Sequence, residues 1–387
     1  MKNLKEKINV LCVFRELLED RVISLLRAYL DVPSPSAYAE LVAALYKANG
    51  GDIAEYVKEL CFNSENVYVK AVGSGRDVPD CIRASLEAEL DILQEVAELD
   101  GEKLCSLLDH KGFLPKFTAT RLSLKELYLQ RVKSIGKYGY GIYARHRMFC
   151  LDGQGCILPV LHPDKTRLCD LVGYERERDV VIDNTKALLA GKPAANILLT
   201  GDAGTGKSST VKAIANELWS EGLRVIEIRK DQLSAIPAVL DELSGNPLKF
   251  VLFIDDLSFL KDDDNFNGLK AVLEGSVTAK SDNVVIYATS NRRHIIRESF
   301  SDREGDDVHR NDTMQELISL SERFGIHVSF SKPDKQTFLN IVHHLAAENG
   351  INMPIGELDA LAERFALERG GRSARLARQL IDSILAR

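Results

Sequence analysis

Apolar residues in the first third of the chain recur at the spacing of a helix. One such group is Leu17, Leu18, Val22, Leu25, Leu26 and Tyr29. Residues three and four positions apart lie on one side of a helix, so the pattern predicts amphipathic helices up to about residue 130. The run Pro33-Ser34-Pro35-Ser36 breaks this pattern and leads into the next helix. We therefore expect a mainly helical N-terminal domain.

A strand-like stretch follows these predicted helices. Residues 142–150 and 156–161 form two apolar runs on either side of the turn signal Asp152-Gly153. His162-Pro163-Asp164 then marks a boundary. We expect the first domain to cover residues 1–165, with a small β element near its end.

From about residue 166 the pattern becomes that of an α/β domain. Short apolar runs at 196–200, 223–229, 250–254, 284–288 and 326–330 alternate with helix-length segments. Such runs predict buried strands of a parallel sheet covered by helices. Helical spacing returns after Lys332-Pro333-Asp334. The chain is therefore expected to contain an α/β domain over 166–330 and an all-helical domain over 331–387.

Composition and charge limit the classes of function. The 387 residues are 45% hydrophobic and 28% charged, which is typical of a globular protein of two or three domains. Fifty Lys and Arg against 57 Asp and Glu give a net charge of −7. This mild acidity argues against a protein that coats DNA or an anionic membrane through bulk charge.

The N-terminus and the cysteines favour a cytoplasmic protein without a membrane segment. The apolar run at 8–14 ends at Arg15-Glu16 and is too short for a spanning helix. The seven cysteines are odd in number and contain no C-x-x-C pair. This arrangement indicates neither a disulfide framework nor a zinc site.

The strongest motif is a phosphate-binding loop. Residues 201–208 match G-x-x-x-x-G-K-[ST] and lie between a predicted strand and a predicted helix. Glycines allow backbone N–H groups to surround phosphate oxygens, the lysine reaches the β- and γ-phosphates, and the last hydroxyl binds Mg²⁺. The predicted nucleotide-binding residues are Gly201, Asp202, Ala203, Gly204, Thr205, Gly206, Lys207, Ser208 and Ser209.

Two carboxylates follow the predicted strand at 250–254. Asp255 is expected to hold Mg²⁺ through water, opposite Ser208, as a Walker B acid does. Asp256 is expected to orient the attacking water or to accept its proton. The sequence thus predicts a site for ATP or ADP with Mg²⁺, in which Lys207, Asp255 and Asp256 carry the chemistry.

The order of the motifs resembles that of AAA+ ATPases. The phosphate loop and the two aspartates are followed by Tyr287-Ala288-Thr289-Ser290-Asn291 and by residues 320–325. Within this class, residues 171–175, 252–259, 287–294 and 371–375 resemble an uncharacterised bacterial family of predicted ATP-binding proteins, a domain of unknown function. The resemblance covers about 166–387. It implies an AAA+ P-loop module with a C-terminal helical lid, and assembly into a homo-oligomer such as a ring or hexamer.

The resemblance also implies roles for further residues. Asn291 is similar to sensor 1, which helps to hold the attacking water. Arg323 is similar to the arginine finger that reaches the γ-phosphate in a neighbouring subunit, an effect of about 10³–10⁵ in rate. Arg375 is similar to sensor 2 of the lid, although Arg372 and Arg378 lie nearby.

The resemblance also concerns the adenine base of the nucleotide and the identity of residue 256. Val172 and Gly173 fall where AAA+ proteins surround adenine. Most AAA+ proteins place glutamate where this chain has Asp256, whose side chain is one methylene shorter. Replication initiators also carry two aspartates there, so slow turnover typical of a switch becomes an alternative to that of a motor.

The use made of ATP is less defined by the sequence. An aromatic pore loop is missing after the predicted strand at 223–229, and Phe266-Asn267-Gly268 lies after the wrong strand for one. This disfavours simple protein threading. Between Arg121 and Arg147, basic residues alternate with Tyr128, Tyr138, Tyr140 and Tyr143, which suits either single-stranded nucleic acid or a docking face for protein.

Two functional classes therefore stand at this point. One is an ATP-hydrolysing AAA+ oligomer that recruits a protein partner through its N-terminal domain and remodels it. The other is a slow nucleotide-dependent switch or adaptor that binds single-stranded nucleic acid in the manner of initiators and helicase loaders. A metabolic kinase is less consistent with the helical C-terminal domain.

Overall fold

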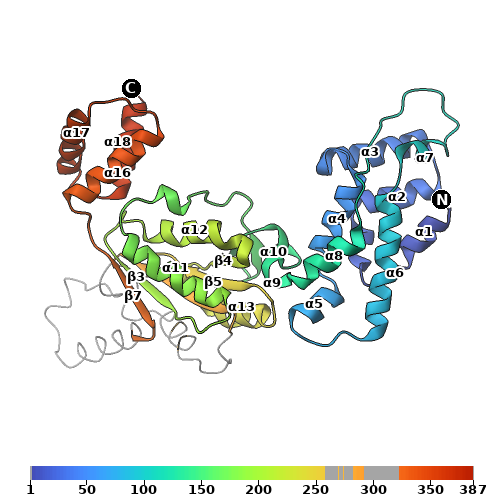
Figure 1. The fold of residues 1–387 in the computed structure, drawn as a ribbon, viewed down its shortest axis with the longest axis horizontal. Helices are drawn as coiled ribbons and strands as arrows, with labels where there is room; N and C mark the ends of the chain where they lie inside the picture. The colour runs from blue at the N-terminus through green and yellow to red at the C-terminus, as the bar shows by residue number, and fades with distance from the viewer. Residues whose placement is uncertain (1, 258–268, 270–272, 274–281, 292–321, 387) are drawn as a thin grey trace. The chain divides into compact units, whose positions relative to one another are not determined.

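The computed structural model describes residues 2–257, 269, 273, 282–291 and 322–386 (Figure 1). The chain forms two compact units. The first contains residues 1–145 together with 245–248, and the second contains 146–244 and 249–387.

The first unit is helical, as the spacing of its apolar residues predicts. Its helices are α1 (Lys2–Asn9), α2 (Arg21–Asp31), α3 (Pro35–Asn49), α4 (Ile53–Asn63), α5 (Val67–Gly73), α6 (Asp80–Ala97), α7 (Gly101–Cys105), α8 (Leu124–Lys133), α9 (Ile135–Tyr138) and α10 (Ile142–Arg145), with a 3₁₀ turn η1 (Arg15–Glu19). The Pro33–Ser36 break becomes the start of α3, where the Ser34 hydroxyl accepts the N–H of Ala37. Pro35 occupies the first turn, where its missing N–H costs nothing.

Polar groups in the core of this first unit bond mainly to its own backbone. The buried hydroxyls of Tyr29 and Tyr38 donate to the carbonyls of Leu104 at 2.6 Å and Pro115 at 2.9 Å. Glu89, on α6, is only 4% exposed. Its carboxylate accepts the N–H groups of three consecutive residues in the turn after α1: Cys12, Val13 and Phe14. These bonds explain how a charged side chain is tolerated within a helix-packed core.

A short piece from later in the chain completes the first unit. Residues 245–248 belong to it, and Leu248 is fully buried. The Leu248 side chain lies against Gly139, whose φ of +67° suits a residue without a Cβ. Pro247 lies against Gly73 in the same way.

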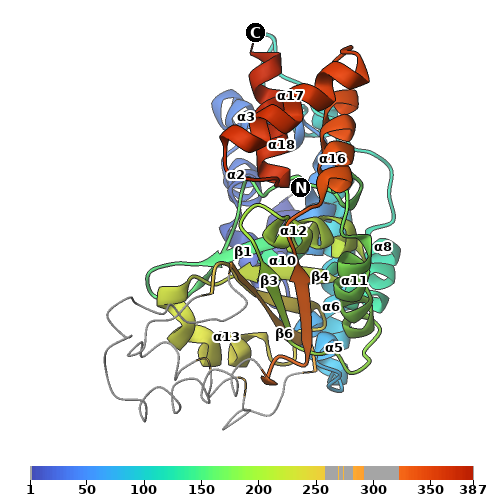
Figure 2. The ribbon, with the colours of Figure 1, turned by 90° about the vertical axis from the view of Figure 1, so that its left-hand side faces the viewer.

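The second unit is built on a seven-stranded sheet with the order β2-β1-β4-β5-β6-β3-β7. The strands are β1 (Met148–Leu151), β2 (Ile157–Pro159), β3 (Ile197–Gly201), β4 (Leu223–Glu227), β5 (Lys249–Ile254), β6 (Val284–Ser290) and β7 (Ile326–Phe330). The five strands predicted from apolar runs are all present and pair in parallel. Figure 2 shows β3 beside β7 and β6.

The β element before residue 165 differs from its predicted place. Residues 142–145 form helix α10 instead of strand, and β1 begins at Met148. β1 pairs antiparallel with β2 and in parallel with β4, so the hairpin belongs to the sheet of the second unit. The boundary between the units therefore falls at 145/146, about twenty residues before the expected one. Local sequence indicates that a strand forms, but its partner is set by tertiary packing.

Helices cover the sheet and form a separate lid. They are α11 (Glu175–Leu189), α12 (Lys207–Leu218), α13 (Ile236–Leu243) and, after β7, α16 (Lys335–Glu348), α17 (Ile355–Glu368) and α18 (Ala374–Leu385). Val181 of α11 and Val211 of α12 share a buried cluster with Leu199 of β3. Helices α16, α17 and α18 pack around a cluster of their own. This is an α/β P-loop module with a C-terminal helical lid.

No helix among the described residues has the length and apolar character needed to cross a membrane.

Candidate active site

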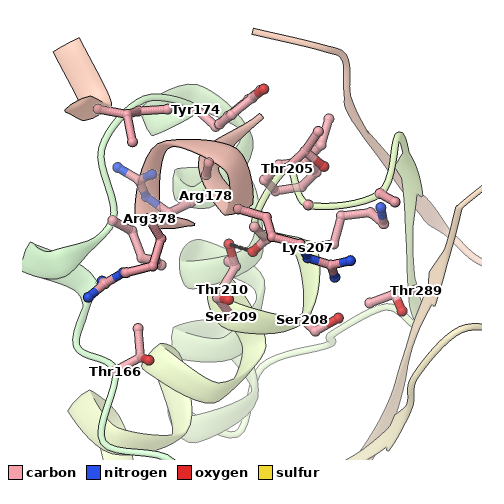
Figure 3. A pocket seen from close by; sticks show the side chains of 18 of the residues that line it. Thr166, Tyr174, Arg178, Thr205, Lys207, Ser208, Ser209, Thr210, Thr289 and Arg378 are labelled. Carbon is pink, nitrogen blue, oxygen red and sulfur yellow. Dashed lines mark hydrogen bonds between the residues drawn. The ribbon is translucent and has the colours of Figure 1, made fainter. Parts of the chain in front are cut away.

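A cavity of about 800 Å³ opens at the carboxyl end of the sheet in the second unit. Four parts of the chain line it: the segment before α11, the phosphate loop, the ends of β5 and β6, and the lid. The lining residues used below are Thr166, Asp170, Val172, Tyr174, Arg178, Ala203, Gly204, Thr205, Gly206, Lys207, Ser208, Ser209, Asp255, Asp256, Thr289, Asn291, Arg375 and Arg378. In the view of Figure 3, Ser208 and Thr289 lie toward one end of the cavity, and Arg378 and Thr166 toward the other.

The phosphate loop has the backbone that its glycines predict. Gly204 and Gly206 have φ values of +79° and +95°, which other residues rarely adopt. A Cβ at Gly201 would overlap the backbone carbonyl of Phe330 on the neighbouring strand β7. The glycine at 201 is thus required by a close approach of two strands, while those at 204 and 206 allow the turn itself.

Lys207 opens α12 and is only 5% exposed. Its Nζ donates to the carbonyls of Gly201 at 2.9 Å and Asp202 at 2.8 Å, and to Asn291 Oδ1 at 3.0 Å. Burial lowers the pKa of this ammonium group, against the opposing effect of three nearby carboxylates. The charge is held at the centre of the loop by neutral oxygens that anionic phosphate can replace.

Asp255 lies where β5 meets the start of α12. Its Oδ1 accepts the hydroxyl of Ser208 at 2.6 Å and that of Thr289 at 2.5 Å, and the N–H of Asp256 at 3.2 Å. The predicted pair for Mg²⁺, Ser208 and Asp255, is therefore in direct contact. Hydroxyl and carboxylate oxygens are the hard ligands that Mg²⁺ prefers, and it usually takes its remaining ligands from water and phosphate. The donor set fits the ion.

Asp256 and Asn291 meet beside Lys207. Asn291 Nδ2 donates to Asp256 Oδ1 at 2.7 Å, while its Oδ1 accepts from Lys207. Asp256 has a φ of +55°, in the left-handed region. The two residues expected to act on the attacking water are thus brought together in the cavity.

The segment before α11 forms the other end of the cavity. Val172 lines it, whereas Gly173 lies behind, where a Cβ would come within 2.9 Å of Thr337 in the lid. The Gly173 N–H donates to Glu175 Oε1 at 2.9 Å, and its carbonyl accepts from the buried Arg178. The peptide at 173 is therefore fixed from both sides.

The lid arginines have different surroundings. Arg372 pairs with Glu363 at 2.7 and 3.0 Å, and this pairing lowers the pKa of the Glu363 carboxyl. Arg375 lines the cavity, and its N–H lies 3.4 Å from the carbonyl of Gly204. Arg378, one turn further along α18, lines it too. The geometry favours Arg375 over Arg372 as the residue facing the phosphate loop.

Arg323 does not line this cavity. It precedes β7, whose first residue, Ile326, pairs with Ile197 at the start of β3. The phosphate loop follows the other end of β3. Five residues of strand span roughly 15 Å, so Arg323 and the loop lie at opposite ends of the parallel strands.

Some predicted features lie outside the described residues, and four cavity residues were not predicted from the sequence. Residues 258–259, 266–268, 292–294 and 320–321, which include the aromatic run at 266, lie outside the described residues. The sequence pattern did not predict a role for Thr289, although this residue lies in the run Tyr287-Ala288-Thr289-Ser290-Asn291. Tyr174, Arg178 and Thr166 were also not recognised, because nothing in their local sequence marks them as cavity residues.

The tyrosines of the basic segment are placed differently from the expectation. Tyr128, Tyr140 and Tyr143 are each less than 9% exposed in the first unit. Tyr138 is more exposed, but Arg131 stacks on its ring at 4.6 Å. Three of the four rings are therefore not available to stack on bases.

Two comparisons found proteins that are similar to this chain. The model of a family described as "Protein of unknown function (DUF815)" matches residues 144–387. Among solved structures, the Thermotoga maritima RuvB Holliday junction branch migration motor has 17% identity and a TM-score of 0.38, over 56% of this chain and 63% of that one. A variant of that RuvB gives 17% and 0.39 over the same shares.

The similar part spans less than two thirds of the RuvB chain. No curated protein matches this chain. The family match covers well over half of the sequence. The chain belongs to the DUF815 family.

Proposed function

We propose that this protein binds ATP and hydrolyses it to ADP and phosphate, and uses the cycle to remodel a macromolecular partner in the cytoplasm. The observation that supports the proposal is the meeting of Lys207, Ser208, Asp255 and Asp256 in one cavity at the carboxyl end of a parallel sheet. Open α/β sheets bind ligands at this edge. The cavity also has an apolar end, near Val172, of the kind that accepts a base.

Each side chain of the site has a separate role in the proposed reaction. Lys207 exchanges the carbonyls of Gly201 and Asp202 for phosphate oxygens, and the loop N–H groups surround the same anion. Asp256 and Asn291 orient a water toward the γ-phosphorus. As the new O–P bond forms, the bond to the β-phosphate oxygen breaks, ADP leaves, and the proton of the water passes to Asp256.

Ser208 and Asp255 would hold Mg²⁺, which supplies positive charge to the phosphate oxygens. Arg375 would add a second charge from the lid. Its position beside Gly204 ties closure of the lid to occupation of the loop.

The site is proposed to be shared between subunits. Arg323 lies at the opposite end of the parallel strands from its own phosphate loop, so it is better placed to serve the site of a neighbouring subunit. A homo-oligomer, ring or hexamer-like, satisfies this geometry. The first unit would then recruit the protein partner.

A slow ATP-dependent switch is the second candidate, and one observation favours it. Asp256 Oδ1 is already bonded to Asn291 Nδ2. Breaking this bond before water can be oriented slows each turnover. Nucleic acid as the partner has less support, since three of the four tyrosines in the basic segment are buried.

Steady-state ATP hydrolysis over a range of protein concentrations tests the proposal, with and without single-stranded DNA. Specific activity should rise with concentration and disappear in Lys207→Ala, because that variant lacks the charge that holds the phosphates. Activity independent of Lys207 would refute the site. Tight ATP binding with negligible, concentration-independent turnover would favour the switch, and stimulation by DNA would restore nucleic acid as the partner.

A further inference from the structure

Thr289, near the end of β6, bonds to each of the three residues that follow β5. Its hydroxyl donates to Asp255 Oδ1 at 2.5 Å and accepts the N–H of Asp256 at 2.9 Å. Its backbone carbonyl accepts the N–H of Leu257 at 2.7 Å. Thr289 is 2% exposed, and it lines the cavity.

The pairing of the two strands creates this arrangement. Ile254 of β5 lies opposite Ala288 of β6, so the next residues, Asp255 and Thr289, come side by side as the strands end. A hydroxyl at 289 is then within reach of both the carboxylate of Asp255 and the backbone N–H that follows it. An aliphatic side chain of the same shape would offer neither bond.

The bonds to Thr289 coincide with a turn in the backbone at Asp256. Its φ of +55° is a conformation in which the Cβ of most L-residues lies too close to the following carbonyl. Asn and Asp adopt it several times more often than other non-glycine residues. Glutamate shares the charge but not this preference. The backbone at 256 therefore selects the shorter acid.

The same turn directs the short side chain to its working position. Asp256 Oδ1 accepts from Asn291 at 2.7 Å, and Asn291 in turn accepts from Lys207. The short carboxylate of Asp256 therefore reaches Asn291 from a left-handed backbone.

We propose that Thr289 is a positioning residue for ATP hydrolysis, which holds residue 256 in the left-handed conformation and so makes aspartate, and not glutamate, the acid that the site requires. This inference rests on the proposed function. It adds a residue that acts through Asp255 and Asp256, and it explains an aspartate where most AAA+ proteins have glutamate.

The test measures kcat and KM for Mg·ATP in the full chain. Thr289→Val should lower kcat at least tenfold and change KM less, because its bond to the Asp256 N–H orients the acid while Ser208 still bonds to the proposed Mg²⁺ ligand Asp255. Thr289→Ser keeps the hydroxyl and should stay within threefold of the wild type. Asp256→Glu should also lose at least tenfold, since its backbone is strained and its carboxylate overshoots.

Asp256→Asn separates the backbone from the charge. Asparagine accepts the left-handed conformation but has no carboxylate, so a loss of kcat in this variant reports the acid itself. Unchanged kcat in this variant would show that hydrolysis does not need the Asp256 carboxylate, and it would overturn the role of Thr289 as well.

Each outcome decides the inference. Thr289→Val with at least half the wild-type kcat would overturn it, as would Asp256→Glu at or above the wild-type rate. Should Thr289→Val not fold, Thr289→Ala takes its place and should lose at least tenfold in kcat relative to Thr289→Ser. A wild type without Lys207-dependent hydrolysis refutes the proposed function first. An active wild type whose variants are equally active refutes only the role of Thr289.

Discussion

The core of the first unit and the cavity of the second unit hold their buried polar groups in different ways. In the core of the first unit, the side chains of Tyr29, Tyr38 and Glu89 bond to backbone groups. In the second unit, Lys207 and Asp255 bond largely to side chains or loop carbonyls in an open cavity. The first set of bonds is fixed by folding, whereas the second can be exchanged for a ligand.

This difference separates stability from function. A buried donor or acceptor that loses its only partner costs the protein its full desolvation penalty. A group that faces a cavity can find another partner, such as phosphate or water, at little cost. Substitutions in the first unit should therefore change the free energy of unfolding, and substitutions around the cavity should change binding and turnover.

The largest effect should come from Arg323→Ala. If the arginine serves the site of a neighbour, its loss should lower kcat by about 10³-fold, because it removes charge from the transition state. Arg323→Lys is the matched control: it keeps one charge without the planar fork and should recover only part of the rate. Steady-state hydrolysis at saturating ATP measures both.

Mixing two inactive variants tests directly whether Arg323 acts in the site of a neighbouring subunit. Arg323→Ala subunits retain a complete phosphate loop, and Lys207→Ala subunits retain the arginine. Mixed oligomers should regain activity that neither variant has alone. Absence of recovery at every mixing ratio would argue that the arginine and the loop do not act across a subunit interface.

The next effect concerns the first unit. Glu89→Ala leaves the N–H groups of Cys12, Val13 and Phe14 without their acceptor and should lower the free energy of unfolding by about 3 kcal/mol. Glu87→Ala, on the same helix, removes only an exposed pair with Lys125 and should change it by less than about 1 kcal/mol. Urea denaturation gives both values.

ATP affinity provides the contrast for this pair of variants. It should be unaltered in Glu89→Ala under conditions where the protein is folded. Equal stability of the two glutamate variants, or an affinity loss restricted to Glu89→Ala, would break the separation between the units.

The smallest effect is a dependence of affinity on pH. Burial lowers the pKa of Lys207 below its ordinary value of 10.5, so its proton is lost at a lower pH than that of an exposed lysine. The protonated form binds phosphate. ATP affinity should therefore be constant below this pKa and should fall as pH rises through it.

Lys207→Arg is the control for this measurement, because arginine remains charged throughout the range. Calorimetric titrations with ATP between about pH 7 and about pH 10 measure the slope for each protein. Parallel slopes for lysine and arginine would mean that another group is responsible.

The sequence predicts those parts of the molecule whose structure depends on residues that are close together in the chain. The phosphate loop is one continuous motif, and its glycines and lysine have the conformations expected of it. The five strands β3 to β7 are apolar runs long enough to be recognised singly. The helical N-terminal domain and the helical lid follow from spacing in the same way.

What the sequence does not predict depends on strand partners and burial. Thr289 matters because β6 pairs with β5 in one register, and β1 joins the sheet because β4 has a free edge. The tyrosines between Arg121 and Arg147 alternate with basic residues, yet packing buries three of them. Alternation along a chain describes which groups are near in sequence, not which reach solvent.

The segment at 245–248 has a practical consequence for dividing this protein into pieces. Because Leu248 packs against Gly139, the first unit is discontinuous in sequence, and the chain passes between the units three times. A recombinant fragment ending at residue 145 would lose Pro247 and Leu248 and expose the apolar surface that they cover. A fragment that joins 245–248 to residue 145 through a short glycine linker should remain soluble where the simple truncation aggregates.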